Sequence, residues 1–302
     1  TTGTRNTAVG YGSLDANTTA DNNTAVGSEA LGANTTGQYN TAVGAFALDA
    51  NTTASANTAV GNGALGANTT GSSNVAVGSN CLLSNTTANN NTAVGHSALS
   101  ANTTAVDNTA VGKDALLTTT TGHENTAMGV SALKLTTTGR SNVAMGRETM
   151  QNNTTGDYNT ALGYEALKAN TTADENVAVG RNTLDANTTG TANTAVGTYA
   201  LRDNVTADNN TAVGKNALLE NEASNNTAVG YQAGTTNTTG TQYVFVGYRA
   251  GYQQTGASAG SVAVGYEALY AAGGPQRNVA LGTQALYATT NYGDNNTGVG
   301  YR

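Results

Sequence analysis

The sequence predicts an all-β protein, a parallel β-solenoid or β-roll of about 18 coils built on a 17-residue repeat. The first observation is the pentapeptide Asn-Thr-Ala-Val-Gly at residues 6–10, which returns every 17 residues to Asn210 and, more loosely, to Asn296. A fixed period of this size is typical of solenoids and arrays. The second is the repeated Gly and Asn-Thr-Thr in each unit, which give weak helix propensity. The third is a composition with no Trp and two Phe, which suits only a narrow core.

The first element of each coil is a short strand at repeat positions 2 to 4, counted from Asn6 as position 1. Positions 2 and 4 carry Thr, Val, Met or Leu, and their alternation predicts a strand with both side chains directed into the coil. Position 3 would then face outward, yet it is almost always Ala. A uniform outward Ala indicates a second surface close against it, so we expect a subunit interface at the column Ala8, Ala25, Ala42, Ala59 and Ala93.

The rest of the coil follows in order. Position 5 is Gly in every copy, from Gly10 to Gly300, and is expected to turn the corner with a positive φ. Positions 6 and 7 vary and are often charged, which indicates a solvent-exposed corner. Position 8 is small, and position 9, usually Leu, is expected to fill the core. Positions 12 to 14 read Asn-Thr-Thr and predict a second short strand, with Asn side chains in an amide-to-amide ladder.

The regularity of the repeat divides the chain into residues 1–225, with regular coils, and residues 226–302, with irregular coils rich in tyrosine. Pro275 is expected in a protruding turn of the second part. Six tyrosines lie in register there and predict two outward aromatic ladders. The stacked rings suit a structural role, in which they protect the fibre end or pack against a following domain, and they are also candidate binding sites for a glycan or a protein partner. The first ladder has Tyr231, Tyr248 and Tyr266 at position 6, and the second has Tyr252, Tyr270 and Tyr287 at position 10.

One pentapeptide resembles a known family. Residues 261–265, Ser-Val-Ala-Val-Gly, resemble the Ser-Val-Ala-Ile-Gly head repeat of trimeric autotransporter adhesins, whose repeats are shorter than those of this chain. The Asn-Thr-Ala-Val-Gly units are also similar to the arrays of phage tail fibres and related surface fibre proteins. The resemblance implies a left-handed parallel β-roll, a homotrimer, and a location that is extracellular, on a cell surface or on a virion surface.

Composition and motifs exclude several classes. The net charge is −7 and the 12 basic residues are not clustered, so we expect no nucleic-acid partner. No apolar run approaches the roughly 20 residues of a membrane helix, so we expect no membrane insertion. No catalytic triad, phosphate loop or cofactor motif is present, and we expect no cofactor and no enzymatic activity. Cys81 and His96 lie one coil apart, but Cys81 occupies a small-residue position typical of a buried, inert thiol.

A calcium site remains an alternative at position 16. Asp157 and Asp174 lie one coil apart there, with Glu175 beside them, and stacked carboxylates can hold Ca²⁺. The same residues also suit a solvated acidic corner. His123, at position 16, and His96, at position 6, are expected on the surface, and the Asn-x-Thr sequons at Asn17 and Asn34 matter only if the host glycosylates them.

These observations together predict a non-enzymatic structural fibre that acts as a rigid rod in adhesion or host attachment. Its expected partners are further copies of itself, as a homotrimer, and a host-surface glycan or protein. An ice-binding β-solenoid with Thr ladders is one alternative, and a self-assembling extracellular filament subunit is another. A polysaccharide lyase on a β-helix would need a cluster of acids and bases in a cleft, which the sequence does not show.

Overall fold

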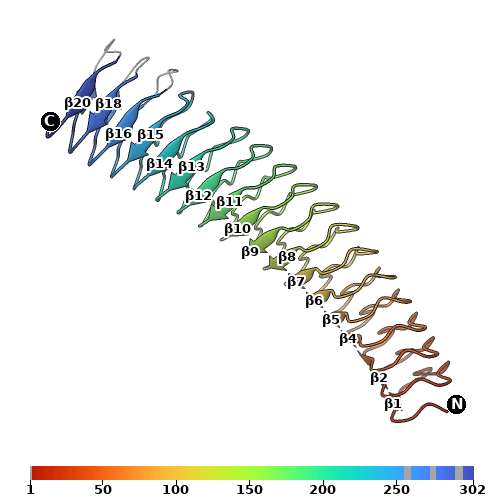
Figure 1. Cartoon of the computed structure of the whole chain (residues 1–302). Coiled ribbons are helices and arrows are strands. Elements are labelled where there is room, and N and C mark those ends of the chain that lie inside the picture. Colours follow the sequence, from red (N-terminus) through yellow and green to blue (C-terminus); the bar gives the residue numbers. More distant parts are fainter. Residues whose placement is uncertain (1, 255–259, 273–276, 290–294) are drawn as a thin grey trace. The chain divides into compact units, whose positions relative to one another are not determined.

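The computed structural model describes residues 2–254, 260–272, 277–289 and 295–302. Contacts divide the chain into two compact units, Thr1–Thr155 and Gly156–Arg302. The change to irregular, tyrosine-rich coils at residue 226 lies inside the second unit. Within each unit the coils stack one upon the next, each contributing a strand to one parallel ladder (Figure 1). The predicted parallel β-solenoid with 17-residue spacing is confirmed.

The first unit contains nine strands, one for each repeat. They pair in parallel and in register, so that Thr41 lies beside Thr58 and Ala42 beside Ala59, one repeat further on. Each strand is three residues long, from position 2 to position 4 of its repeat. The strands are β1 (Thr7–Val9), β2 (Thr24–Val26), β3 (Thr41–Val43), β4 (Thr58–Val60), β5 (Val75–Val77), β6 (Thr92–Val94), β7 (Thr109–Val111), β8 (Thr126–Met128) and β9 (Val143–Met145).

The second unit continues the same pattern of parallel, in-register pairing. Its three-residue strands are β10 (Thr160–Leu162), β11 (Val177–Val179), β12 (Thr194–Val196), β13 (Thr211–Val213), β14 (Thr227–Val229), β15 (Val244–Val246), β16 (Val262–Val264), β18 (Val279–Leu281) and β20 (Thr297–Val299). Two further short strands, β17 (Ala271–Ala272) and β19 (Ala288–Thr289), pair with each other. The parts of the chain that the structure describes contain no helix, and so no helix there could cross a membrane.

A second strand in every coil, predicted at Asn-Thr-Thr, is wrong for the regular coils. The backbone N–H groups of Thr35 and Thr36 both donate to the carbonyl of Thr52, at 2.9 and 3.2 Å, and the Thr35 hydroxyl donates to it at 3.0 Å. Three donors on one carbonyl do not form the evenly spaced hydrogen bonds of a parallel strand ladder, and the segment is not a strand. The segment is nevertheless tied to the next coil by hydrogen bonds.

The prediction that position 3 faces outward is also wrong, and so is the subunit interface at this column. Ala25, Ala42, Ala59 and Ala93 have no exposed surface within the single chain, and only Ala8, in the first strand, is exposed. The side chains at positions 2 and 4 face outward instead. Because the interior of the coil is narrow, the inward strand position has room for a methyl group only, and the larger Thr and Val side chains lie outside.

The core is built from leucine and asparagine. Position 9, for example Leu48 and Leu99, is fully buried, as predicted. Asparagines at positions 1 and 12 are also buried, and those at position 12 form the predicted amide-to-amide ladder, in which Asn51 Nδ2 donates to Asn34 Oδ1 at 2.9 Å. At position 1, Asn40 Oδ1 accepts the backbone N–H of Asn57 at 3.0 Å. Most of these buried amide groups are therefore hydrogen-bonded, as buried polar groups usually are.

The corner after the strand depends on glycine for a reason beyond its positive φ. Gly61 has φ +138°, and a Cβ on it would lie 2.5 Å from the carbonyl oxygen of Gly78 in the next coil. The backbones of successive coils thus approach too closely for any side chain. Two and four positions after the corner glycine, the left-handed conformation is taken by ordinary residues: Phe46 has φ 58° and Leu48 has φ 51°.

The core of one coil is packed with different residues from those of the other coils. In β15 the usual position-3 Ala is Phe245, and the ring occupies the space of two missing position-9 leucines. A Cβ on Gly234 would lie 2.7 Å from the Phe245 ring, and a Cβ on Gly251 would lie 2.6 Å from it. Tyr243 replaces the usual Asn at position 1, and its ring centroid lies 5.1 Å from that of Phe245. The aromatic ring at position 3 of the strand thus fills the volume that leucine side chains at position 9 fill in other coils.

Candidate functional site

The side chains at positions 6, 7 and 10 form one stripe along the coils of each unit, which we call the corner strip. Position 7 lies between the other two: the Arg249 guanidinium lies over both the ring of Tyr248, at position 6, and the ring of Tyr252, at position 10. The main chain at the corner is held by bonds between coils, such as Phe46 N–H to the carbonyl of Ser28 at 2.9 Å. Side chains of the strip are therefore free to differ from coil to coil.

The first predicted tyrosine ladder is confirmed. Tyr231 and Tyr248 have ring centroids 5.4 Å apart, and Tyr248 and Tyr266 are 5.2 Å apart with an interplanar angle of 5°. The three side chains are 39, 38 and 49% exposed. Each tyrosine of this ladder thus stacks on its neighbours in the ladder and stays accessible to a partner.

The second predicted ladder is confirmed as well. Tyr252 and Tyr270 stack at 5.2 Å, and Tyr270 and Tyr287 at 5.0 Å with an angle of 4°. These three residues are half-buried. Burial is the main cause that raises the pKa of the Tyr270 hydroxyl, which stays protonated and can donate a hydrogen bond at neutral pH.

Arg249 joins the two ladders. Its guanidinium carbon lies 5.2 Å from the Tyr248 ring centroid and 5.4 Å from that of Tyr252, and its Nε donates to Gln232 Oε1 at 2.8 Å. Cation–π contacts of this kind fix an arginine without an acidic partner. The result is a patch in which Arg249 lies between two rows of phenols, while Arg302 lies over the ring of Tyr287 in the second row.

The stacking decides which surface the patch presents. Because neighbouring rings cover one another's faces, the ladders turn ring edges and hydroxyl groups outward. Near Tyr266 the carboxylate of Glu267 is the main cause that raises the pKa of the tyrosine hydroxyl. The patch therefore offers hydrogen-bond donors and acceptors at a spacing close to that of stacked strands, which suits a ligand rich in hydroxyl groups or a polar protein surface.

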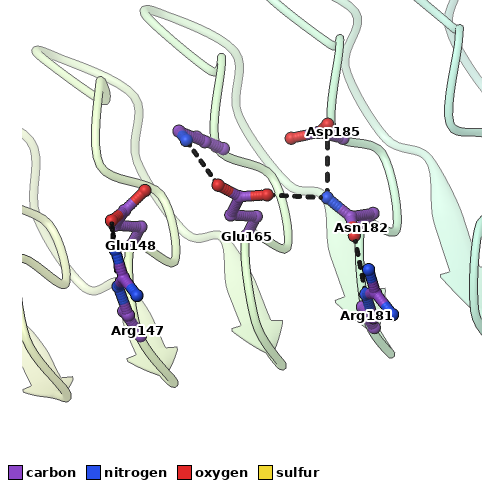
Figure 2. A network of polar contacts seen from close by, with 7 residues as sticks. Arg147, Glu148, Glu165, Arg181, Asn182 and Asp185 are labelled. Carbon is purple, nitrogen blue, oxygen red and sulfur yellow. Dashed lines mark hydrogen bonds and ion pairs between the residues drawn. The ribbon is translucent and has the colours of Figure 1, made fainter.

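A polar network occupies the corner strip earlier in the second unit (Figure 2). Glu165 lies between two donors: Lys168 Nζ is 2.6 Å from Oε1 and Asn182 Nδ2 is 2.9 Å from Oε2. Asn182 also reaches Asp185 at 3.4 Å and accepts from Arg181 Nε at 3.1 Å. The hydrogen bond from Lys168 is the main cause that lowers the pKa of Glu165. The polar side chains in this section of the strip therefore bind one another.

In the first unit, Arg147 and Glu148 form an ion pair of the same strip, with Arg147 Nη2 at 2.7 Å from Glu148 Oε1 (Figure 2).

The thiol and histidine candidates remain separate. Cys81 is buried, and burial raises the pKa of its thiol. The Sγ donates to the carbonyls of Val77 and Gly95, while His96 Nδ1 forms a hydrogen bond with Ser97. These contacts give no support to a nucleophile pair.

The position-16 carboxylates have a structural use. Asp174 Oδ1 accepts the backbone N–H of Asp157 at 2.7 Å, and Asp208 Oδ1 accepts that of Thr191 at the same distance. In the described parts of the chain, no group of three or more His, Cys, Asp or Glu side chains is placed to hold a metal ion. Pro275 lies outside the described residues.

The outward strand face is a feature that the sequence reasoning missed. Position 4 is exposed in many coils, for example Val43 at 37%, Met145 at 38% and Val264 at 38%. Beside it runs the position-2 column of Thr and Val, which is half-buried in most coils. The signal that could have revealed it is the uniform Ala between them, because only a confined inner position needs so uniform and so small a side chain.

Comparison with known proteins adds no relative. No protein-family model matches the chain, and neither a curated protein nor a solved structure shows significant similarity to it.

Proposed function

We propose that this chain is a non-enzymatic structural fibre segment of a cell or virion surface, which acts as a rigid rod in adhesion or attachment. The observation that carries the proposal is the continuous set of bonds between coils within each unit. It combines the strand ladder, backbone bonds such as Leu31 N–H to the carbonyl of Ala47 at 3.0 Å, and the buried Asn ladders. Stacking of this kind resists bending and leaves few segments open to proteases.

Stiffness can be tested directly by stretching single molecules of the full chain. We expect unfolding in discrete steps of one or a few coils at high force, since each coil is bonded to the next all round its circumference. A chain that extends smoothly at low force would contradict a load-bearing role.

The contact surface in this proposal is the tyrosine patch of the corner strip. It would meet a host-surface glycan or protein through its hydroxyl groups and Arg249. The test is the double variant Tyr248→Ser with Tyr266→Ser, assayed on host cells and on a glycan array. Tyr164→Ser is the matched control, because Tyr164 is also at position 6 and is 39% exposed.

We expect the double variant to bind about tenfold more weakly, a loss of about 1.4 kcal/mol, and the control to bind normally. Normal attachment by a folded double variant would leave the tyrosines with a structural role only.

Association of copies, including the trimer, would use the exposed position-4 column in place of the alanines. Exposed Val and Met in register from coil to coil give a self-complementary surface to identical chains in symmetric contact. Light scattering on the full chain tests this, since a monomeric mass at all concentrations would remove it.

Ice binding is a second candidate, favoured by the outward face of strands β2–β9. Thr or Val at position 2 and Val or Met at position 4 repeat there in register, in one parallel ladder. We would measure ice recrystallisation for Thr92→Lys with Thr109→Lys on this face, and for Thr104→Lys, an exposed position-14 residue, as the control. Equal inhibition of ice recrystallisation by the parent protein and both variants would discard this candidate.

A further inference from the structure

The corner strip of the first unit has a gap. In the coil that begins at Asn57, positions 7 and 10 are both glycine, Gly63 and Gly66. The neighbouring coils carry Phe46 and Asp49 on one side and Leu83 on the other. A hollow of about 410 Å³ results, lined by Phe46, Asp49, Gly63, Gly66, Ala67, Leu83 and Ser84. We call it the Phe46 notch.

The glycines are what keep the notch open. A Cβ on Gly66 would lie 3.4 Å from Asp49 Oδ1 and 3.4 Å from Leu83 Cδ1, and one on Gly63 would lie 3.4 Å from the same Leu83 atom. Side chains at these two positions would therefore stand between the carboxylate and the apolar wall. Without them, Asp49 and Leu83 border one space, and Phe46 remains 49% exposed beside it.

Among the residues that line the notch, Asp49 is the charged one, and its charge is negative. Asp49 is half-buried, and burial is the main cause that raises the pKa of its carboxyl, with Glu29 acting in the same direction. No Lys or Arg occurs in the sequence between Arg5 and Lys113. The carboxylate thus lies in a partly apolar hollow in a stretch of chain that supplies no cationic side chain.

We propose that the Phe46 notch binds an organic cation, an ammonium group on an alkyl chain. The ammonium donates to the Asp49 carboxylate in charge-assisted hydrogen bonds. The alkyl chain lies against Leu83, and the aromatic ring of Phe46 attracts the positive charge. A volume of about 410 Å³ falls within the usual range for small-molecule sites, which combine apolar walls with few polar groups.

The same chemistry could come from a free amine or from a lysine side chain of a polypeptide. A titration of the full chain with n-butylammonium, beside one with a Gly-Lys-Gly peptide, distinguishes them. Tighter binding of the peptide indicates a polypeptide source, and equal or weaker binding indicates the free amine. Failure of both to bind overturns the proposal. This outcome does not bear on the fibre function, because the notch lies apart from the tyrosine patch in the sequence.

The decisive comparison is between a charged ligand and an uncharged ligand of similar shape. We expect saturable one-to-one binding of n-butylammonium and binding about tenfold weaker, or none, for n-butanol, which has the same chain but no charge. Equal binding of the alcohol would overturn the cation site.

Two substitutions locate the site. Gly66→Leu fills the notch with the residue that position 10 already carries at Leu83, and should abolish binding; Ser100→Leu, one coil beyond Leu83 in the same column, should not. Asp49→Asn should weaken binding about tenfold, while Asp15→Asn, another position-10 aspartate, should leave it unchanged. Melting curves verify that each variant is folded. Unchanged binding by a folded Gly66→Leu protein would place the ligand elsewhere and refute the notch.

Discussion

Asn40 and Asn51 donate their side-chain Nδ2 groups to one carbonyl oxygen, that of Ala54, at 2.8 and 3.1 Å. The two residues are 11 positions apart in a single coil, and Ala54 carries the carbonyl at position 15. The next coil repeats the arrangement, with Asn57 and Asn68 both at 2.9 Å from the carbonyl of Gly71. Each coil is thereby closed from inside by two buried amides.

Asn51→Ala should destabilise the protein by about 1–3 kcal/mol, the cost of leaving buried polar partners unsatisfied. The substitution removes the donor to Asn34 Oδ1 and the acceptor of Asn68 Nδ2. The measurement is the free energy of unfolding from denaturant titration. Asn62→Ala, at an exposed corner with one long side-chain bond of 3.4 Å, is the control and should cost far less. Similar losses in both variants would contradict the closing role of the inner amides.

Phe245→Ala should cost about 3–5 kcal/mol, because a fully buried ring is removed and a cavity is left. Adding Gly234→Leu and Gly251→Leu should recover much of this loss, since these are the position-9 sites where other coils have buried leucine. In the presence of Phe245 the same two leucines should instead clash with the ring. A triple variant no more stable than Phe245→Ala would disprove the volume exchange.

Ala93→Arg should unfold the coils around it, since its side chain has no exposed surface and an arginine there would be an unpaired buried charge. Val94→Arg, on the outward side of the same strand, should keep the β-structure by circular dichroism. If copies associate through position 4, it should also lower the mass in solution. A folded Ala93→Arg protein would reverse the assignment of the two strand faces.

Asp49→Asn should stabilise the protein by an amount that grows with pH. Burial raises the pKa of this carboxyl above its ordinary value of 3.8, so the folded protein binds the proton more tightly than the unfolded chain. Ionisation of Asp49 therefore destabilises the fold, an effect absent below the unfolded pKa and complete above the folded one. Melting temperatures should agree between variant and parent at about pH 3 and favour the variant at about pH 7. A parent protein more stable than the variant at neutral pH would contradict the raised pKa.

The sequence was enough to predict the repeat, the buried leucines, the asparagine ladder and both tyrosine stacks, because these depend on residue type at a fixed period. It was not enough to orient a three-residue strand, where Thr-Ala-Val fits either face. The width of the interior decides that point, and the uniform Ala at position 3 is the one sign of it in the sequence. The left-handed Leu48 was equally hidden, since this conformation favours Gly or Asn locally and is imposed here by the packing of the coil. The Phe46 notch was missed because it arises where two positions, Gly63 and Gly66, lack side chains.

The corner strip has a consequence for how such a protein can change. Asn182 and Arg249 occupy the same repeat position, and the backbone N–H of each donates to the preceding coil at 2.9 Å, as that of Phe46 does. The main-chain bond is the same whether the side chain is aromatic, amide or cationic. Substitutions there can alter the surface of one stretch of the chain at little cost to folding. Duplication of a single 17-residue segment would also add a second copy of whatever patch it carries, so that such a surface can grow by lengthening the gene.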